Sequence, residues 1–320
     1  MPHLNKPCTV PYRPYRRFGL MLELIFKRQY QVNYQMRALI KKNTVVAIAI
    51  GTLFLAAITI LREPALLDRY FVYFPDSNLE FTPSNVGLDY ENVYFTTKDG
   101  YKLHGWLIPG QADFTFVLFH GNAGNISDRL DYVELLHRNV GASILIFDYR
   151  GYGLSEGVPS ESGLYLDGQA SIELLISHYY PEINEENIVL LGRSLGSAVA
   201  IKLASLYEVR SLVVEAPFTS IGALAKYNYP FLPEVLLNRI LKARYDSRIN
   251  MKSLRVPLMV IHGGRDSVVP IAMGRELYES ADVPKYFYSV DGADHNDTYI
   301  VAGVDYFEQI KYFIERLPTE

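Results

Sequence analysis

The stretch IVLLGRSLGSAVA, residues 188–200, decides the fold. Residues 188–191 form a short apolar run, which is typical of a strand buried on both faces. The run leads directly into Gly192-Arg193-Ser194-Leu195-Gly196, and a helical pattern follows to residue 207. Glycines on both sides of Ser194 allow a sharp strand-to-helix turn that holds a serine in a strained conformation with its hydroxyl exposed. The alternative is a glycine-rich turn with a solvated serine.

Further apolar runs around this stretch predict the rest of a sheet. They cover residues 114–119, 142–147, 212–214 and 258–261, with a less purely apolar run at 286–290. Helical patterns lie between them, and the runs 92–97 and 101–108 flank a hairpin turn signature, Lys98-Asp99-Gly100. Strands that alternate with helices are typical of α/β proteins. We therefore expect an α/β fold with a doubly wound, mostly parallel sheet and an antiparallel hairpin at its start.

One interval breaks this alternation. Residues 219–250 contain no further strand pattern and are longer than a plain crossover, so we expect a small helical cap inserted there. The folded domain is expected to cover residues 89–320. Residues 62–88 are interrupted by Pro64, Pro75 and Pro83 and are interpreted as a linker.

Charge and cysteine content exclude several classes of protein. The 320 residues contain one cysteine, Cys8, which excludes a disulfide framework, a cysteine-based zinc site and a Cys-x-x-Cys redox motif. Residues 1–61 carry nine Lys/Arg and one acid, Glu23, which leaves 22 basic and 34 acidic residues in 62–320. A body with a net charge of −12 is a poor binder of polyanions, so we expect no nucleic-acid partner.

The basic N-terminal region precedes an apolar segment. Residues 44–61, TVVAIAIGTLFLAAITIL, carry no charge over 18 positions, which is at the short end of a bilayer span. The positive-inside rule then predicts a cytoplasmic basic tail (1–43), a transmembrane signal anchor (44–61) in contact with the lipid bilayer, and the large domain on the non-cytoplasmic side of a membrane. A buried core helix and a cleaved signal peptide that starts at Met36 are the alternatives.

Two further strand ends carry residues that suit a serine nucleophile. A serine hydroxyl reacts weakly unless a neighbouring base takes its proton, and neutral histidine is the usual base. His295 follows the last predicted strand on a loop, where it can reach Ser194; His120 and His262 also end strands and compete for this role. Asp266 follows the strand at 258–261 and can orient the imidazole, although an N-cap or turn role is the alternative.

Three other carboxylates, Asp291, Asp294 and Asp297, lie closer to His295 in sequence. Neighbours within one loop seldom bring their side chains together in the required geometry, so Asp266 is preferred. The order Ser194, Asp266, His295 is the order that such a triad has on a strand–turn–helix serine.

A fourth strand end supplies small residues, His120-Gly121-Asn122-Ala123-Gly124-Asn125. Such a loop lets backbone N–H groups approach a developing oxyanion, and we expect the N–H groups of Asn122 and Leu195 to form that hole. An ordinary turn in which an asparagine caps the next helix is the alternative. The proposed chemistry requires no cofactor and no metal.

Five motifs in this order resemble the α/β-hydrolase superfamily of serine hydrolases, and more narrowly its membrane-anchored abhydrolase-domain branch. They are FHGNAGN (119–125), FDYRGYGLSEG (147–157), GRSLGSA (192–198), YPFLPEVL (229–236) and HGGRDSVVP (262–270). The resemblance covers the chain from about residue 85 to its end. It implies an α/β-hydrolase fold, the triad Ser194, Asp266 and His295, and oxyanion donors at Asn122 and Leu195.

These residues favour a serine hydrolase that cleaves carboxylic ester or thioester bonds through an acyl-enzyme intermediate. An aromatic and leucine-rich cap favours a lipid-like or otherwise acylated small-molecule substrate. A peptidase or amidase with the same triad is one alternative, and a non-catalytic membrane scaffold on a hydrolase fold is the other.

Overall fold

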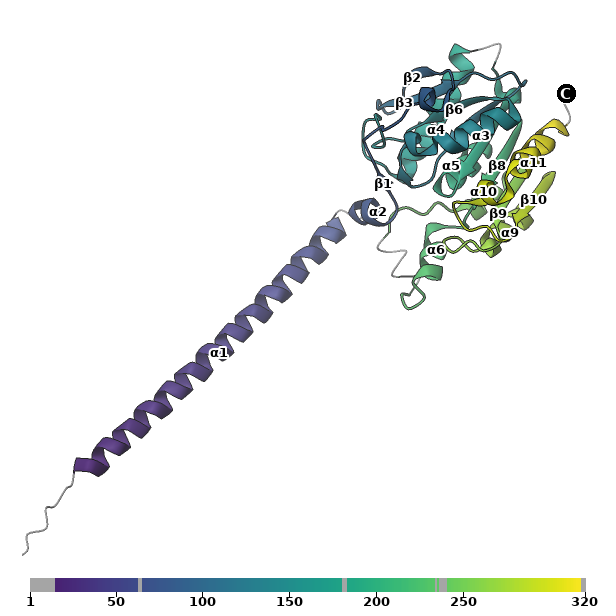
Figure 1. Cartoon of the computed structure of the whole chain (residues 1–320). Helices are drawn as coiled ribbons and strands as arrows, with labels where there is room; N and C mark the ends of the chain where they lie inside the picture. The colour runs from purple at the N-terminus through teal and green to yellow at the C-terminus, as the bar shows by residue number, and fades with distance from the viewer. Residues whose placement is uncertain (1–14, 63–64, 180–182, 234, 236–240, 318–320) are drawn as a thin grey trace, which may run out of the picture. The chain divides into compact units, whose positions relative to one another are not determined.

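Figure 1 shows the computed structural model of the protein, which describes residues 15–62, 65–179, 183–233, 235 and 241–317. The chain divides into two compact units, Met1–Arg62 and Glu63–Glu320. The described residues of the first unit form one helix of 48 residues, α1 (Tyr15–Arg62). The second unit contains the sheet and all candidate site residues.

The predicted membrane span at 44–61 lies within α1. Among the described residues, no helix has both the length and the apolar character that are needed to cross a bilayer. The side chains of residue 53 and residues 56–61 lie outside the described set. An 18-residue run is at the short limit of a span, and here it continues a helix whose preceding residues include Lys41 and Lys42. The transmembrane signal anchor and the membrane location stay predictions.

The second unit is built on an eight-stranded sheet with the order β10-β9-β8-β7-β4-β6-β3-β2. Six neighbouring strands, from β10 to β6, are parallel, and β3 pairs antiparallel with both β6 and β2. The strands are β2 (Glu91–Thr96), β3 (Lys102–Ile108), β4 (Thr115–Phe119), β6 (Ser143–Phe147), β7 (Ile188–Arg193), β8 (Ser211–Glu215), β9 (Leu258–Gly263) and β10 (Lys285–Val290). The predicted mostly parallel sheet and its initial hairpin are confirmed.

Alternation along the central strands divides the core into two layers. On β4, Val117 and Phe119 belong to the apolar cluster on one face of the sheet, whereas Phe116 and Leu118 belong to the cluster on the other. Successive side chains of a strand point to opposite faces, so a strand covered on both faces is apolar throughout. This is why the predicted strands are recognisable as continuous apolar runs.

Helices cover both faces. The cluster that contains Phe119 takes side chains from α4 (Glu161–His178), α5 (Leu195–Ala204) and α9 (Ile271–Ser280). The cluster that contains Leu118 takes side chains from α3 (Leu130–Val140), α10 (Thr298–Ala302) and α11 (Val304–Glu315). Short 3₁₀ helices at Pro83–Val86, Ile126–Arg129 and Glu185–Asn187 precede longer elements.

Part of the stretch interpreted as a linker belongs to the folded unit. Helix α2 (Ala65–Phe71) leads to β1 (Phe74–Pro75), which pairs with β5 (Ala123–Gly124). Val72 and Tyr73 are buried in the core. The prolines at 75 and 83 suggested an extended linker, but Pro75 lies in a two-residue edge strand and Pro83 begins a 3₁₀ helix, where a missing N–H costs little.

The interval predicted to form a cap contains α6 (Ile221–Asn228) and α8 (Ser247–Met251), between β8 and β9. Residues 234 and 236–240 of this interval lie outside the described residues. No strand is assigned in its described part, in agreement with the sequence pattern.

Candidate active site

Ser194 stands at the junction of β7 and α5, where its backbone is strained. Its φ of 51° and ψ of −116° lie in a region that residues with a side chain rarely adopt. The Ser194 N–H donates to the carbonyl of Glu215 on the neighbouring strand at 2.9 Å, which holds the turn in place. As the N-cap of α5, Ser194 lies at the positive end of the helix dipole.

The flanking glycines permit the predicted sharp turn because a side chain at either position would clash with the backbone. Neither has a positive φ; the positive φ belongs to Ser194 itself. A Cβ at Gly196 would lie 2.0 Å from the carbonyl oxygen of Phe119, and one at Gly192 would lie 2.4 Å from the carbonyl oxygen of Gly196. The two glycines therefore allow the first turn of α5 to pack directly against β7 and β4.

The structure brings Ser194, His295 and Asp266 together. His295 Nε2 lies 3.0 Å from Ser194 Oγ, and His295 Nδ1 lies 2.8 Å from Asp266 Oδ2. Both distances are within hydrogen-bond range. Because an uncharged imidazole carries one proton, a proton on Nδ1 that is donated to Asp266 leaves Nε2 free to accept from the serine hydroxyl. The constellation has the geometry of a nucleophile, a base and an orienting acid.

Asp266 is fixed from several directions. Its Oδ1 accepts the backbone N–H groups of Val268 at 2.9 Å and Val269 at 2.7 Å. Burial by itself would raise the pKa of this carboxyl, but the hydrogen bonds from His262 and His295 and the Val269 N–H outweigh burial and lower its pKa. Asp266 is therefore ionised at neutral pH and does not compete for the Nδ1 proton.

The two competing histidines have other partners. His262 Nε2 lies 2.9 Å from the carbonyl oxygen of Val269 and 3.4 Å from Asp266 Oδ2. His262 therefore helps to hold the Asp266 carboxylate in position. His120 Nδ1 lies 2.7 Å from the carbonyl oxygen of Gly121. Burial lowers the pKa of His120 to about 3, which makes it neutral at every physiological pH.

The His120 bond orients the loop that carries the predicted oxyanion donor. The Gly121 carbonyl and the Asn122 N–H belong to one planar trans peptide, so they point in opposite directions. When His120 Nδ1–H holds the carbonyl on one side, the Asn122 N–H faces the other side. The Asn122 carbonyl is fixed in turn by the Phe74 N–H at 2.9 Å and the Tyr152 hydroxyl at 2.8 Å.

The loop lies directly against the nucleophile. A Cβ at Gly121 would lie 3.8 Å from the Cβ of Ser194. The second predicted donor, Leu195, is the first residue of α5, whose N–H has no acceptor within the helix. Leu195 and Asn122 line the same cavity as Ser194 and His295.

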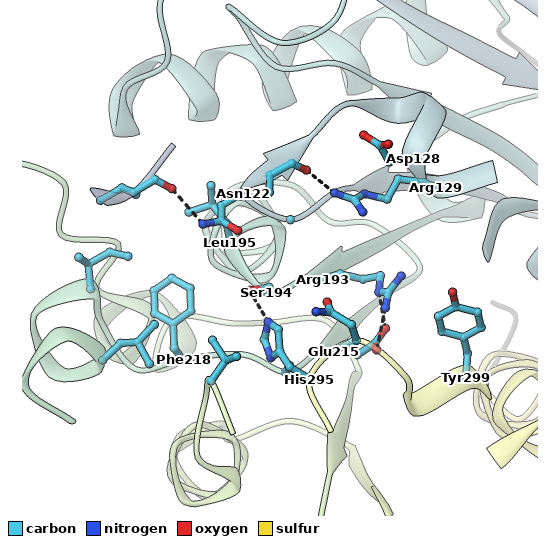
Figure 2. A pocket seen from close by; sticks show the side chains of 18 of the residues that line it. Asn122, Asp128, Arg129, Arg193, Ser194, Leu195, Glu215, Phe218, His295 and Tyr299 are labelled. Carbon is cyan, nitrogen blue, oxygen red and sulfur yellow. Dashed lines mark hydrogen bonds and ion pairs between the residues drawn. The ribbon is translucent and has the colours of Figure 1, made fainter. Parts of the chain in front are cut away.

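This cavity has a volume of about 490 Å³ and two chemically different sides. Figure 2 shows Phe218 on one side of the Ser194–His295 pair and Arg193, Glu215 and Tyr299 on the other. We call the part of the cavity beside Phe218 the apolar side and the part beside Arg129, Arg193, Glu215 and Tyr299 the polar side. The apolar residues that line the whole cavity include Phe71, Val72, Phe218, Ile221, Leu224 and Val268, and the polar ones include Asp128, Arg129, Asp131, Arg193, Glu215, Asn296 and Tyr299.

The sequence analysis did not identify the polar side of the cavity. Arg193 and Glu215 are register partners on β7 and β8, and Arg193 Nε lies 2.7 Å from Glu215 Oε2. The guanidinium lies over the rings of Tyr132 and Tyr299, at 4.4 and 5.2 Å from their centroids. Two strand-terminal residues of opposite charge on adjacent strands were the available signal. Within the described part of the chain, no group of three or more His, Cys, Asp or Glu side chains is arranged to hold a metal ion.

Comparisons with known proteins agree with this fold. A family described as serine aminopeptidase, S33, matches residues 110–252. The chain is 36% identical over 250 residues to the uncharacterized protein Rv2307c of Mycobacterium tuberculosis, covering 77% of this chain and 87% of that protein. It is 31% identical over 257 residues to the alpha/beta hydrolase domain-containing protein WAV2 of Arabidopsis thaliana, and the match covers 75% of this chain and 83% of that protein. The chain belongs to the α/β-hydrolase family.

A solved structure with the same fold is the esterase Pf2001 of Pyrococcus furiosus. The TM-score is 0.65 at 26% identity, and the match covers 76% of this chain and 99% of that one. The resemblance deduced from the five motifs is thus confirmed for the superfamily.

Proposed function

We propose that the protein is a serine hydrolase that cleaves carboxylic esters or thioesters through an acyl-enzyme intermediate. The observation that carries the proposal is the continuous hydrogen-bonded chain from Asp266 through His295 to the strained Ser194. Family membership and the esterase among the structural neighbours support hydrolytic chemistry. A strained nucleophile at the end of a central strand, with a base and an acid in contact, has no evident structural purpose.

The mechanism follows from the contacts. His295 Nε2 takes the proton of Ser194 as Oγ attacks the acyl carbonyl carbon, and the Asp266 carboxylate stabilises the resulting imidazolium. The N–H groups of Asn122 and Leu195 stabilise the oxyanion, and each such donor typically contributes ~2.7–4 kcal/mol to the transition state. The imidazolium then gives its proton to the leaving alkoxide or thiolate. Water, activated by the same imidazole, releases the acid and restores the serine.

The apolar side of the cavity supports an acyl substrate. Phe218 follows β8, Ile221 and Leu224 lie on α6, and together with Phe71 they supply apolar lining to the cavity that contains Ser194. A lining of this kind stabilises a bound hydrocarbon by about 0.8 kcal/mol for each buried CH₂ group. A cavity of about 490 Å³ has room for a medium acyl chain.

The test is hydrolysis of p-nitrophenyl esters of graded acyl length, with aminoacyl anilides as the comparison. We expect kcat/KM to rise with chain length until the apolar side is filled, and we expect Ser194→Ala to abolish the reaction. Esters that are not hydrolysed faster by the wild type than by Ser194→Ala would contradict the proposal.

Amide hydrolysis is the second candidate, because the matched family is described as a serine aminopeptidase. The carboxylates on the polar side of the cavity are the feature that favours it, since an acidic group can bind a free amino terminus. Aminoacyl anilides cleaved faster than every ester in the panel would favour this candidate over the first.

A further inference from the structure

The polar side of the cavity contains an arginine whose donors are largely unused. Arg129 ends the 3₁₀ helix that precedes α3, and its Nη2 donates to the carbonyl oxygen of Ala123. Its Nε is buried and has no hydrogen-bond partner among the described residues. A guanidinium offers five N–H donors in a planar fork, and a buried donor without a partner is costly. Arg129 is therefore prepared for an acceptor that the protein does not itself supply.

The neighbouring carboxylates are already engaged with other groups. Glu215 is bound by Arg193 and by the Tyr306 hydroxyl at 2.8 Å. Asp131 accepts the hydroxyl of Tyr299, and Asp128 Oδ2 accepts the Asn125 N–H at 2.8 Å. These bonds stabilise the loops that form the cavity wall. Each of these carboxylates has at least one hydrogen-bond partner, whereas the buried Nε of Arg129 has none among the described residues.

The electrostatic environment of Arg129 points the same way. Burial, followed by the positive charge of Arg193, lowers the pKa of the Arg129 guanidinium, whereas Asp128 and Asp131 partly offset both effects. The two guanidinium groups repel each other, although Glu215 pairs with Arg193 and the carboxylates of Asp128 and Asp131 also act on Arg129. An anionic oxygen group placed beside Arg129 would relieve that repulsion and fill its empty donor positions.

The position of Arg129 relative to Ser194 indicates which part of a substrate it can contact. In Figure 2, Arg129 and Arg193 lie on the side of Ser194 opposite Phe218. The acyl chain and the alcohol or thiol are two substituents of the attacked carbonyl carbon, and they point in different directions. If the acyl chain occupies the apolar side, the departing alcohol or thiol therefore occupies the polar side.

We propose that the polar side is a leaving-group subsite in which Arg129 binds an anionic oxygen group, a phosphate or a carboxylate, carried by the alcohol or thiol that Ser194 displaces. This inference rests on the proposed hydrolase function. In the reaction, a bond forms between Ser194 Oγ and the acyl carbon, the bond from that carbon to the leaving oxygen or sulfur breaks, and His295 supplies the proton. The anionic group remains on Arg129 until the leaving group departs.

The experiment compares four esters that share the acyl chain preferred in the p-nitrophenyl series. Their alcohols are glycerol 3-phosphate, glycolate, glycerol and choline, which supply a phosphate, a carboxylate, no charge and a cation. We expect the phosphate or the carboxylate ester to exceed the glycerol ester in kcat/KM by at least about tenfold. Whichever of these two esters has the higher kcat/KM shows whether the subsite prefers a phosphate or a carboxylate.

Variants test whether Arg129 is responsible. In Arg129→Gln the ratio of kcat/KM for the anionic ester to that for the glycerol ester should fall by about 10–100-fold, the range for loss of a hydrogen bond to a charged group. Arg129→Lys keeps the positive charge, so this variant should retain part of the preference for the anionic ester. The matched control is Arg138→Gln on α3, since Arg138 pairs with Glu134 outside the cavity lining and should leave the ratio unchanged.

Two results would overturn the inference: a ratio that Arg129→Gln does not move, or a wild-type preference for the choline or glycerol ester. Failure of the hydrolase proposal is distinct, because then neither these esters nor the p-nitrophenyl esters are hydrolysed. Binding remains measurable in that case. Calorimetry of glycerol 3-phosphate with Ser194→Ala should give a heat of binding that is lost in Ser194→Ala/Arg129→Gln, and equal heats would refute the role of Arg129.

Discussion

Replacement of Asp266 by asparagine tests the role of the acid without altering its shape. The side chain is held by two N–H donors, from Val268 and Val269, which both point at Oδ1. In Asp266→Asn these donors select the orientation in which the amide oxygen occupies the Oδ1 position. The amide nitrogen must then occupy the Oδ2 position, 2.8 Å from His295 Nδ1.

This forces the wrong tautomer on the histidine. An amide N–H directed at Nδ1 requires that atom to be the acceptor, so the single imidazole proton moves to Nε2. Nε2–H then faces Ser194 Oγ and cannot take its proton. We expect kcat to fall by a factor on the order of 10³–10⁴ with the fold intact, the range for loss of an orienting acid in such a triad.

The assay is hydrolysis of the best p-nitrophenyl ester, with circular dichroism as the check on folding. Asp291→Asn is the matched control, because Asp291 is exposed and belongs to the same loop as His295. A folded Asp266→Asn variant that keeps more than about a tenth of the wild-type kcat would refute the assignment of Asp266.

Three further predictions concern the surroundings of the site. His120→Leu removes the bond that orients the Gly121 carbonyl, so kcat should fall about 100-fold while KM changes little; equal changes in both constants would contradict an oxyanion role. Gly196→Ala places a Cβ 2.0 Å from the Phe119 carbonyl oxygen and should lower the melting temperature sharply or prevent folding, whereas Gly121→Ala, with its nearest contact at 3.8 Å, should fold. Burial raises the folded-state pKa of Asp148 from 3.8 to about 8, so the native state holds the extra proton between those values and stability falls as pH rises through that window. The free energy of unfolding of Asp148→Asn, measured with urea from pH 5 to pH 9, should not show this decline. If the free energies of variant and wild type fall in parallel with pH, the raised pKa of Asp148 is contradicted.

The sheet was predictable because its strands are buried on both faces. Such strands are continuously apolar, and every apolar run between residues 114 and 290 identified as a strand is one in the structure. The position of Ser194 was predictable for a related reason, since few sequences place glycines at both 192 and 196 around a serine between a strand and a helix. The spatial neighbours Asp266 and His295 followed from the rule that parallel strands end at one edge.

The polar side of the cavity was not predictable in the same way. Arg129 and Asp131 occupy a helix start, where charged residues are usually solvated. The sequence pattern does not show that they line one cavity with Arg193 and Glu215 from the ends of β7 and β8. The linker interpretation failed for residues 72–75 because prolines mark both linkers and edge strands.

The most direct test of the central claim is covalent labelling of the full-length protein by a fluorophosphonate, with mass spectrometry of the labelled peptide. The proposed chain of hydrogen bonds predicts one modification on Ser194, lost in Ser194→Ala and strongly slowed in His295→Ala. Labelling that persists in Ser194→Ala, or a wild-type protein that stays unlabelled although it is folded, would contradict the assignment of residue 194 as an activated nucleophile.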